Sequence, residues 1–424
     1  MKLASYWYLL RGNRNFRLVW LAQIVSELGD WFYSVAIFSF LLELTGSAQI
    51  VSLAFMMQVL PQFFVSPVAG VINDRMSRKR VMIFADWMRA AIVLSMMLVR
   101  SRGALWLLFV LLFLETVCWA LFEPARSAVY PNITAIEQRP VANALGSATW
   151  SINFAIGAGL GGLADVAFGR NTVFVLNSLS FVLSALLISR MRFAEPHAEN
   201  LPPLTLRGLF DFSPIAEGVR YVARDPKLLA TIFLKGGAGL MGANWVILPV
   251  LGERVFPVRL AGLSAQQAGT LGMSTLLASR GIGAIIGSVL GGNIAGLDPA
   301  RLRGMILIGF VMAAGGYLAL GNAGSLMVAV VTLWIAHAGG SSVWTASTTL
   351  LQQQTDDRFR GRVFSAEFAF TTLTLAVSSL IAGKLVDAGV SVRMVAMGTG
   401  AVMLIPAAGW MIAGRAWKEG RHLK

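Results

Sequence analysis

Twelve long apolar runs follow one another through this sequence, and they constrain its fold more than any other feature. The hydrocarbon core of a bilayer takes about 20 apolar residues per helix, and each run is close to that length or longer. The runs cover residues 17–42, 50–72, 81–99, 104–125, 142–167, 171–190, 228–251, 266–295, 304–321, 326–350, 362–385 and 391–413. Hydrophobic residues make up 56% of the chain and charged residues 13%, which is typical of a polytopic membrane protein.

These runs predict helices, because backbone polar groups in lipid must be satisfied inside the segment. The short alternating segments of a membrane β-barrel are missing. The eighth run, residues 266–295, is long enough to tilt or to extend into water. We therefore expect an all-α membrane protein with twelve transmembrane helices.

A net charge of +14 is also found in proteins that bind nucleic acid, so the distribution of Lys and Arg along the chain decides between the two classes. With the N-terminus inside, 25 of the 35 basic residues fall on the cytoplasmic side, 7 outside and 3 within helices. This asymmetry is the positive-inside rule and excludes a nucleic-acid footprint. We expect a multi-pass protein of the cell inner (plasma) membrane with both termini in the cytoplasm.

Catalytic and metal-binding patterns are missing from the sequence. Three histidines and the single Cys118 form no metal site. The only Gly-Lys dipeptide, Gly383-Lys384, precedes Leu385 and is no phosphate-binding loop. We expect neither an enzyme nor a bound cofactor or metal.

The longest polar interval, residues 191–227, divides the chain into segments 1–190 and 228–424 with six runs each. Within it, Ser213 and Pro214 predict the start of a short amphipathic helix. That helix lies either on the cytoplasmic membrane surface or free in solvent.

The two halves show a weak repeat. Gly70 matches Gly292 at a spacing of 222 residues, and Arg139 matches Arg360 at 221. Parallel repeats of six helices imply two bundles related by an axis along the membrane normal, with the substrate route between them.

The loop "GVINDRMSRKR", residues 70–80, places five charges between the second and third runs. Gly70 would permit close approach of helices. Asp74 would accept hydrogen bonds at a helix N-terminus and pair with arginines. We interpret the loop as a latch between the bundles; the alternative is that its basic residues only fix the topology.

The loop resembles the signature loop of the major facilitator superfamily, G-x-x-x-D-R-x-x-R-K/R-R. "ELTGSAQIVSLAFMMQVLPQFFVSPVAGVINDR", "FEPARSAVYPNI", "FVLNSLSFVLSALL" and "RGRVFS" resemble the branch that contains macrolide efflux proteins and the enterobactin exporter. "ELGDW" and "EPARSA" give a more distant similarity to lysophospholipid transporters.

The resemblance implies the major facilitator fold and a cytoplasmic gating motif that opens when access alternates. The motif comprises Gly70, Asp74, Arg75, Arg78 and Arg80, with the pair Glu123 and Arg126 below the fourth run. In the second half Gly296 replaces the aspartate, so the latch should be one-sided.

Exporters of the drug antiporter branch of this superfamily tend to carry a Gly-Pro-x-x-Gly-Gly stretch on the fifth helix. This chain has Gly157, Gly161 and Gly162, but Ala158 replaces the proline. Close helix packing is expected at these glycines, whereas the kink attributed to proline is not.

Charges inside the apolar runs are candidates for proton coupling or substrate binding, because a buried charge is costly unless it is paired or wet. Glu27 and Asp30 share a helix face with Gln23 and Ser34, and two ionised carboxylates there would repel each other. Lys235 is a predicted partner of Asp30. The remaining candidates are Glu115 and Arg280.

Each candidate also has a structural interpretation. Asp30 would serve equally as an inter-helix hydrogen-bonding group, and Arg280 as the partner of an acid. Glu367 is interpreted as part of the latch, and His337 as a packed histidine with a backbone partner.

Together these observations predict a monomeric secondary active transporter that exports amphipathic, drug- or siderophore-like small molecules in exchange for protons. Its expected partners are that substrate, protons and membrane lipids. The alternatives are a lysophospholipid transporter or flippase, and a transporter-like sensor that no longer cycles.

Overall fold

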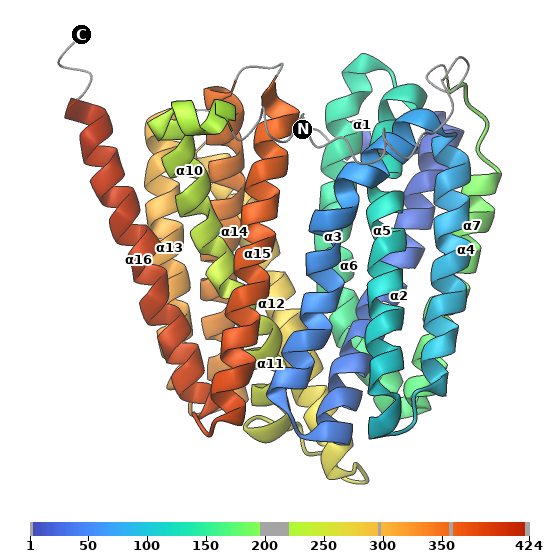
Figure 1. The fold of residues 1–424 in the computed structure, drawn as a ribbon, viewed down its shortest axis with the longest axis vertical. Helices are drawn as coiled ribbons and strands as arrows, with labels where there is room; N and C mark the ends of the chain where they lie inside the picture. Colours follow the sequence, from blue (N-terminus) through green and yellow to red (C-terminus); the bar gives the residue numbers. More distant parts are fainter. Residues whose placement is uncertain (1–2, 196–219, 296–297, 356–358, 420–424) are drawn as a thin grey trace. The chain divides into compact units, whose positions relative to one another are not determined.

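The computed structural model describes residues 3–195, 220–295, 298–355 and 359–419. Within these ranges it contains helices and no strands, and twelve segments are long and apolar enough to cross a membrane. Each of the twelve coincides with a predicted run, so the all-α membrane fold is confirmed (Figure 1).

The first half of the chain contains a short helix followed by six membrane-spanning ones. Its elements are α1 (Leu3–Gly12), α2 (Arg14–Thr45), α3 (Ala48–Arg75), α4 (Arg78–Ser95) with the 3-10 turns η1 (Met96–Leu98) and η2 (Arg102–Ala104), α5 (Leu105–Ile133), η3 (Ile136–Gln138), α6 (Arg139–Phe168) and α7 (Arg170–Ser189).

The seventh span is interrupted, and the other five of the second half are continuous. The elements are α10 (Pro226–Gly236), η5 (Gly237–Ala243), α11 (Asn244–Arg254), α12 (Ala265–Ala295), α13 (Pro299–Gly321), α14 (Leu326–Gln354), α15 (Arg360–Asp387) and α16 (Val392–Glu419).

Helix starts follow the expected capping chemistry. Ser77 caps α4 by accepting the N–H of Arg80, and Ser325 caps α14 by accepting that of Val328. Asp225 and Asp298 cap α10 and α13, each followed by proline at the first helical position.

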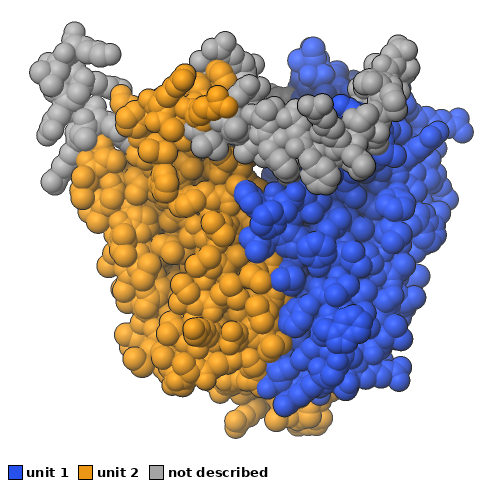
Figure 2. Space-filling view, in the orientation of Figure 1, with its two compact units in different colours: residues 1–45, 57–211 blue, residues 46–56, 212–424 orange. Residues whose placement is uncertain are grey.

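The chain forms two compact units, coloured separately in Figure 2. Unit 1 comprises residues 1–45 and 57–211, and unit 2 comprises residues 46–56 and 212–424. The division at 211/212 falls inside the predicted linker. Residues 46–56 of α3 were expected in the first bundle, but they belong to unit 2, where the Asp387 carboxylate accepts the N–H groups of Ala48 (2.8 Å) and Gln49 (3.1 Å).

Most of the predicted linker helix lies outside the described residues. Residues 220–224 are helical, whereas residues 213–219 belong to the part that the structure leaves undescribed. Within unit 1, α2 packs on α6 and α7, and α4 packs on α5 and α7. Within unit 2, α14 packs on α12 and α13, and η5 packs on α15.

Candidate functional site

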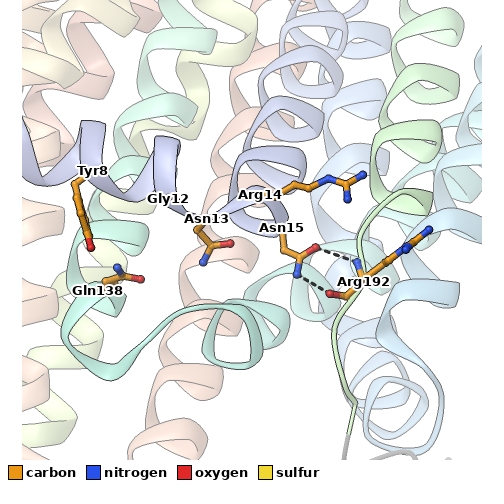
Figure 3. Close-up of a pocket in the computed structure, with 7 residues that line it drawn as sticks. All are labelled: Tyr8, Gly12, Asn13, Arg14, Asn15, Gln138 and Arg192. Carbon is orange, nitrogen blue, oxygen red and sulfur yellow. Dashed lines mark hydrogen bonds between the residues drawn. The ribbon is translucent and has the colours of Figure 1, made fainter.

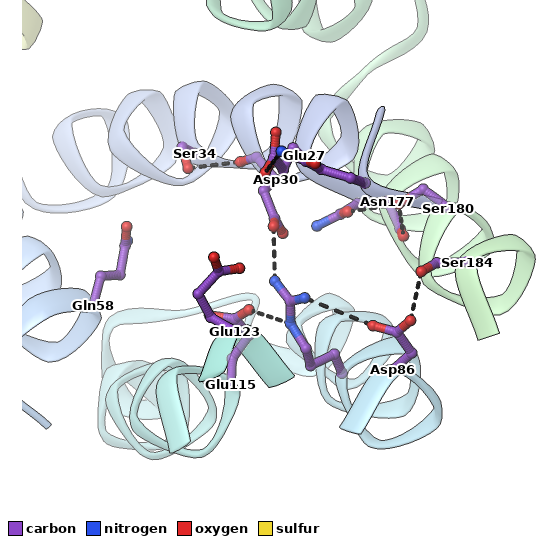
Figure 4. A network of polar contacts seen from close by, with 12 residues as sticks. Glu27, Asp30, Ser34, Gln58, Asp86, Glu115, Glu123, Asn177, Ser180 and Ser184 are labelled. Atoms are coloured by element: carbon purple, nitrogen blue, oxygen red, sulfur yellow. Dashed lines mark hydrogen bonds and ion pairs between the residues drawn. The ribbon is translucent and has the colours of Figure 1, made fainter. Parts of the chain in front are cut away.

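Arg89 of α4 stands at the centre of a buried charge cluster in unit 1. Figure 4 labels its three acidic partners, Asp30, Asp86 and Glu115. Nη2 of Arg89 lies 2.7 Å from Oδ2 of Asp30 on α2, and its Nε lies 2.8 Å from Oε1 of Glu115 on α5. Its Nη1 is 3.8 Å from Oδ1 of Asp86, one turn earlier on α4. One guanidinium therefore joins three helices through three carboxyl groups.

The surroundings of Arg89 hold the cluster in place and bury its guanidinium. Arg89 is 2% exposed, and its guanidinium carbon lies 3.9 Å from the centre of the Phe181 ring on α7. Ser184, also on α7, donates a 2.6 Å hydrogen bond to Asp86. With all three carboxyls ionised, the cluster would carry two negative charges more than its guanidinium neutralises, so it can take up protons or a cation.

Glu27 belongs to a second network on the same helix. It accepts hydrogen bonds from Gln23 (2.8 Å) and from Asn153 of α6 (3.1 Å). Gln23 in turn accepts a 2.6 Å hydrogen bond from Arg126, whose Nε is 3.0 Å from Glu123. The chain of contacts therefore links Glu27 to the Glu123–Arg126 ion pair through an amide.

The two α2 carboxylates, predicted to share a helix face, have different partners. Asp30 contacts Arg89, whereas Glu27 contacts the neutral amides of Gln23 and Asn153. Ser34 donates to the backbone carbonyl of Asp30 at 2.7 Å and does not contact its carboxylate there.

Unit 2 contains a buried ion pair of its own. Nζ of Lys235, at the end of α10, lies 3.0 Å from Oε1 of Glu367 on α15. It also donates to Thr348 at 2.9 Å and lies 4.4 Å from the centre of the Trp344 ring, both on α14. Lys235 is 2% and Glu367 3% exposed.

One prediction changes as a result. Asp30 pairs with Arg89 and Lys235 with Glu367, so each finds its counter-ion inside its own unit instead of in the predicted Asp30–Lys235 pair. Glu367, interpreted from the sequence as part of the latch, forms this buried ion pair near the start of α15.

Lys235 lies where the seventh span changes its helical geometry. The seven-residue 3-10 segment η5 follows directly after α10, and such a stretch inside a longer helix is uncommon and often marks a hinge. A Cβ at Gly239 would lie 2.8 Å from the carbonyl oxygen of Thr371. The glycine thus allows η5 to approach the backbone of α15.

The other cation predicted in unit 2, Arg280 of α12, lies over an aromatic ring. Its guanidinium carbon is 4.3 Å from the centre of the Trp245 ring, which stacks on Phe55 at 4.8 Å. His337 contacts the Tyr317 hydroxyl at 3.1 Å, so its partner is a side chain and not the predicted backbone group.

The signature loop forms contacts within unit 1. Nη1 of Arg78 donates to the carbonyl of Ala128 on α5 at 3.0 Å. Glu195, just after α7, accepts hydrogen bonds from Ser77 Oγ and from the backbone N–H of Lys79. The start of α4 is therefore tied both to α5 and to the first residues of the predicted linker.

Other positions of this motif carry less of the packing than expected. A Cβ at Gly70 would meet none of the described atoms within 4 Å, so this glycine does not provide the predicted close approach here. Arg75 is half-buried and Arg80 exposed. The side chains of Asp74 and Arg360 lie outside the described part of the chain.

Close packing does occur at two of the three predicted glycines of α6. A Cβ at Gly157 would lie 2.6 Å from Cβ of Trp31. One at Gly161 would lie 2.7 Å from Cα of Phe32 and 3.0 Å from its carbonyl oxygen. Gly162 is buried on the same helix. Small residues at these positions let α6 lie against α2, which carries Glu27 and Asp30.

Replacing Gly161 with valine is expected to separate α6 from α2 and to lower the free energy of unfolding by about 1–3 kcal/mol, as overpacking usually does. The clashing atoms belong to the Phe32 backbone and cannot rotate away. Thermal unfolding in detergent would measure the loss. Gly398→Val is the matched control, because a Cβ at Gly398 meets no described atom within 4 Å; an equal loss in both variants would contradict the packing argument.

Sequence reasoning missed two members of the Arg89 cluster. Asp86 and Arg89 stand three residues apart in the third apolar run, which places them on one helix face. An acid and a base at this spacing inside an otherwise apolar run were the signal that could have found them.

Comparisons with known proteins agree with this architecture. The model of a family described as "Transmembrane secretion effector" matches residues 4–419. The uncharacterized MFS-type transporter YkuC of Bacillus subtilis strain 168 is 27% identical over 242 residues, 56% of each chain. Macrolide efflux protein A of Streptococcus pyogenes is 23% identical over 380 residues, 88% of this chain and 89% of that protein.

Among solved structures, a bacterial homologue of the human lysosomal transporter Spinster superposes with a TM-score of 0.73 at 13% identity. The superposition covers 99% of both chains and shows the shared fold. Because the family match extends over nearly the whole sequence, the chain is a transporter of the major facilitator superfamily and belongs to its transmembrane secretion effector family.

Proposed function

We propose that this transporter exports amphipathic small molecules in exchange for protons, and that the Asp30–Arg89–Glu115 cluster exchanges the protons. The observation that carries the proposal is the surplus of carboxyl groups around one buried guanidinium. Charge inside the bilayer is costly unless it is compensated. A proton or a cationic group of the substrate can provide that compensation at different stages of a cycle.

The relatives support export as the direction of transport. Macrolide efflux protein A is similar to this chain over 88% of its length, which supports export of an amphipathic compound. The excess of basic residues in one set of loops supports a plasma-membrane location with cytoplasmic termini. In this orientation the Glu123–Arg126 pair lies on the cytoplasmic half of α5, and Arg78 contacts the same half through the carbonyl of Ala128. There these residues would stabilise one end state as gating residues.

Proton release from vesicles that contain the purified protein tests the proposal. A macrolide, a siderophore and a lysophospholipid would be added in turn, and the internal pH recorded with a fluorescent dye. We expect a substrate-dependent proton flux with the macrolide or siderophore that Asp30→Asn abolishes while substrate binding persists.

Glu43→Gln is the matched control, because Glu43 lies on the same helix but is about half exposed and 3.7 Å from Arg170. Its proton flux should remain close to that of the wild type. Unchanged flux in Asp30→Asn would refute the assignment of the cluster. A proton flux with the lysophospholipid alone would show that the protein transports lipids and not drugs.

A further inference from the structure

A cavity of about 320 Å³ opens in unit 1 beside the first turn of α2, far along that helix from Asp30. It is lined by Tyr8, residues 12–15, Gln138 and Arg192 (Figure 3). The lining includes the two basic residues Arg14 and Arg192 and no acidic residue. The lining therefore carries a net positive charge, which favours an anionic ligand.

The position of Arg192 at this cavity is fixed by its backbone. Asn15 donates through Nδ2 to the carbonyl of Arg192 at 2.7 Å and accepts the N–H of Arg192 at 2.9 Å. This reciprocal pair holds the residues that follow α7 against the start of α2. The side chains of Arg14 and Arg192 are exposed, and neither forms an ion pair among the described residues.

Helix length places the cavity at the level of lipid headgroups. The 32 residues of α2 span about 48 Å at about 1.5 Å per residue, whereas the hydrocarbon core is about 30 Å thick. The first turn of α2 therefore extends beyond the acyl chains.

The short helix α1 also places the cavity at the level of the lipid headgroups. Leu9 is 1% exposed and docks α1 on the unit, whereas Trp7 is 58% and Tyr8 72% exposed. Exposed Trp and Tyr rings next to arginines are typical of the membrane interface. Tyr8 thus belongs both to the cavity lining and to the surface that faces the lipid.

We propose that this cavity binds the phosphate of an anionic phospholipid from the leaflet at the N-terminal end of α2. Arginine donates two parallel hydrogen bonds to phosphate oxygens. The side chains of Arg14 and Arg192 extend toward the same side of the cavity, away from Tyr8 and Gln138, so the phosphate would bind between these two arginines (Figure 3). The net positive lining selects an anionic headgroup over a zwitterionic one, and the exposed rings of Trp7 and Tyr8 provide an apolar path for the acyl chains.

Native mass spectrometry of the full-length protein tests the site, with dioleoyl phosphatidylglycerol and dioleoyl phosphatidylcholine as probes. Each arginine near an anionic lipid contributes about a fivefold gain in binding. The double variant Arg14→Gln/Arg192→Gln should therefore bind phosphatidylglycerol about thirtyfold more weakly. Phosphatidylcholine carries the same phosphate without a net charge, so it should bind the wild type more weakly and lose less binding in the double variant.

The control removes the same amount of charge elsewhere. Arg100→Gln/Arg301→Gln changes two exposed arginines outside the cavity, the second of them 71% exposed. An equal loss in this control would show general electrostatic attraction and overturn the proposal. Displacement of phosphatidylglycerol by an equal concentration of inorganic phosphate would identify a soluble anion as the ligand and would also overturn it. Both double variants should elute from size exclusion like the wild type, which excludes misfolding as the cause.

Discussion

Replacing Arg89 with glutamine is expected to abolish transport and to lower the free energy of unfolding by about 3–5 kcal/mol, the usual cost of breaking a buried ion pair. Arg89 is 2% exposed and is the common partner of Asp30, Asp86 and Glu115. Glutamine keeps one amide donor group but removes the positive charge that holds α2 and α5 against α4. Transport would be measured in vesicles, and stability by chemical unfolding in mixed micelles.

A second variant separates the structural from the functional role of this cluster. Asp30→Asn/Asp86→Asn/Arg89→Gln removes two carboxylates together with the cation, so it should recover much of the lost stability while transport stays absent. Arg170→Gln is the control, since Arg170 and Glu43 are partly exposed and 3.7 Å apart, and such pairs contribute about 0–1 kcal/mol. Full transport by Arg89→Gln would rule out the cluster as the proton-exchange site.

The sequence alone predicted the membrane spans well, because the length of an apolar run is set by the bilayer and not by neighbouring helices. The run at 50–72 became α3 at 48–75, and the run at 228–251 became α10, η5 and α11. The interruption of that span was not predicted. It depends on close contacts between η5 glycines and α15 that no local pattern contains.

Partners of buried charges were harder to predict, because periodicity identifies the face of a helix but not the helix that packs against it. Asp30 and Arg89 are 59 residues apart, and Lys235 and Glu367 are 132 apart. The pairing of Asp30 with Lys235 assumed that equivalent helices of the two halves present their charges to each other. In the structure each charge has a nearer partner within its own unit.

The Lys235–Glu367 pair leads to the second large effect. Lys235→Met should lower the free energy of unfolding by about 3–5 kcal/mol, because it leaves the Glu367 carboxylate buried without its cation. Thr371 still approaches that carboxylate at 3.3 Å, but a hydroxyl dipole cannot replace a full charge. The double variant Lys235→Met/Glu367→Gln removes both charges, and its stability should return to within about 1 kcal/mol of the wild type.

The reversed pair distinguishes simple charge pairing from the geometry of this site. Lys235→Glu/Glu367→Lys keeps an ion pair but places a carboxylate against the face of Trp344, where the Lys235 ammonium now lies 4.4 Å from the ring centre. The negative face of an aromatic ring attracts cations and repels anions. The reversed variant should therefore be less stable than the neutral double variant, as measured by chemical unfolding in the same micelles. Equal stability of the two variants would mean that Trp344 contributes nothing to holding Lys235. Arg301→Met is the control, because the exposed Arg301–Asp298 pair gives the baseline for losing a surface charge.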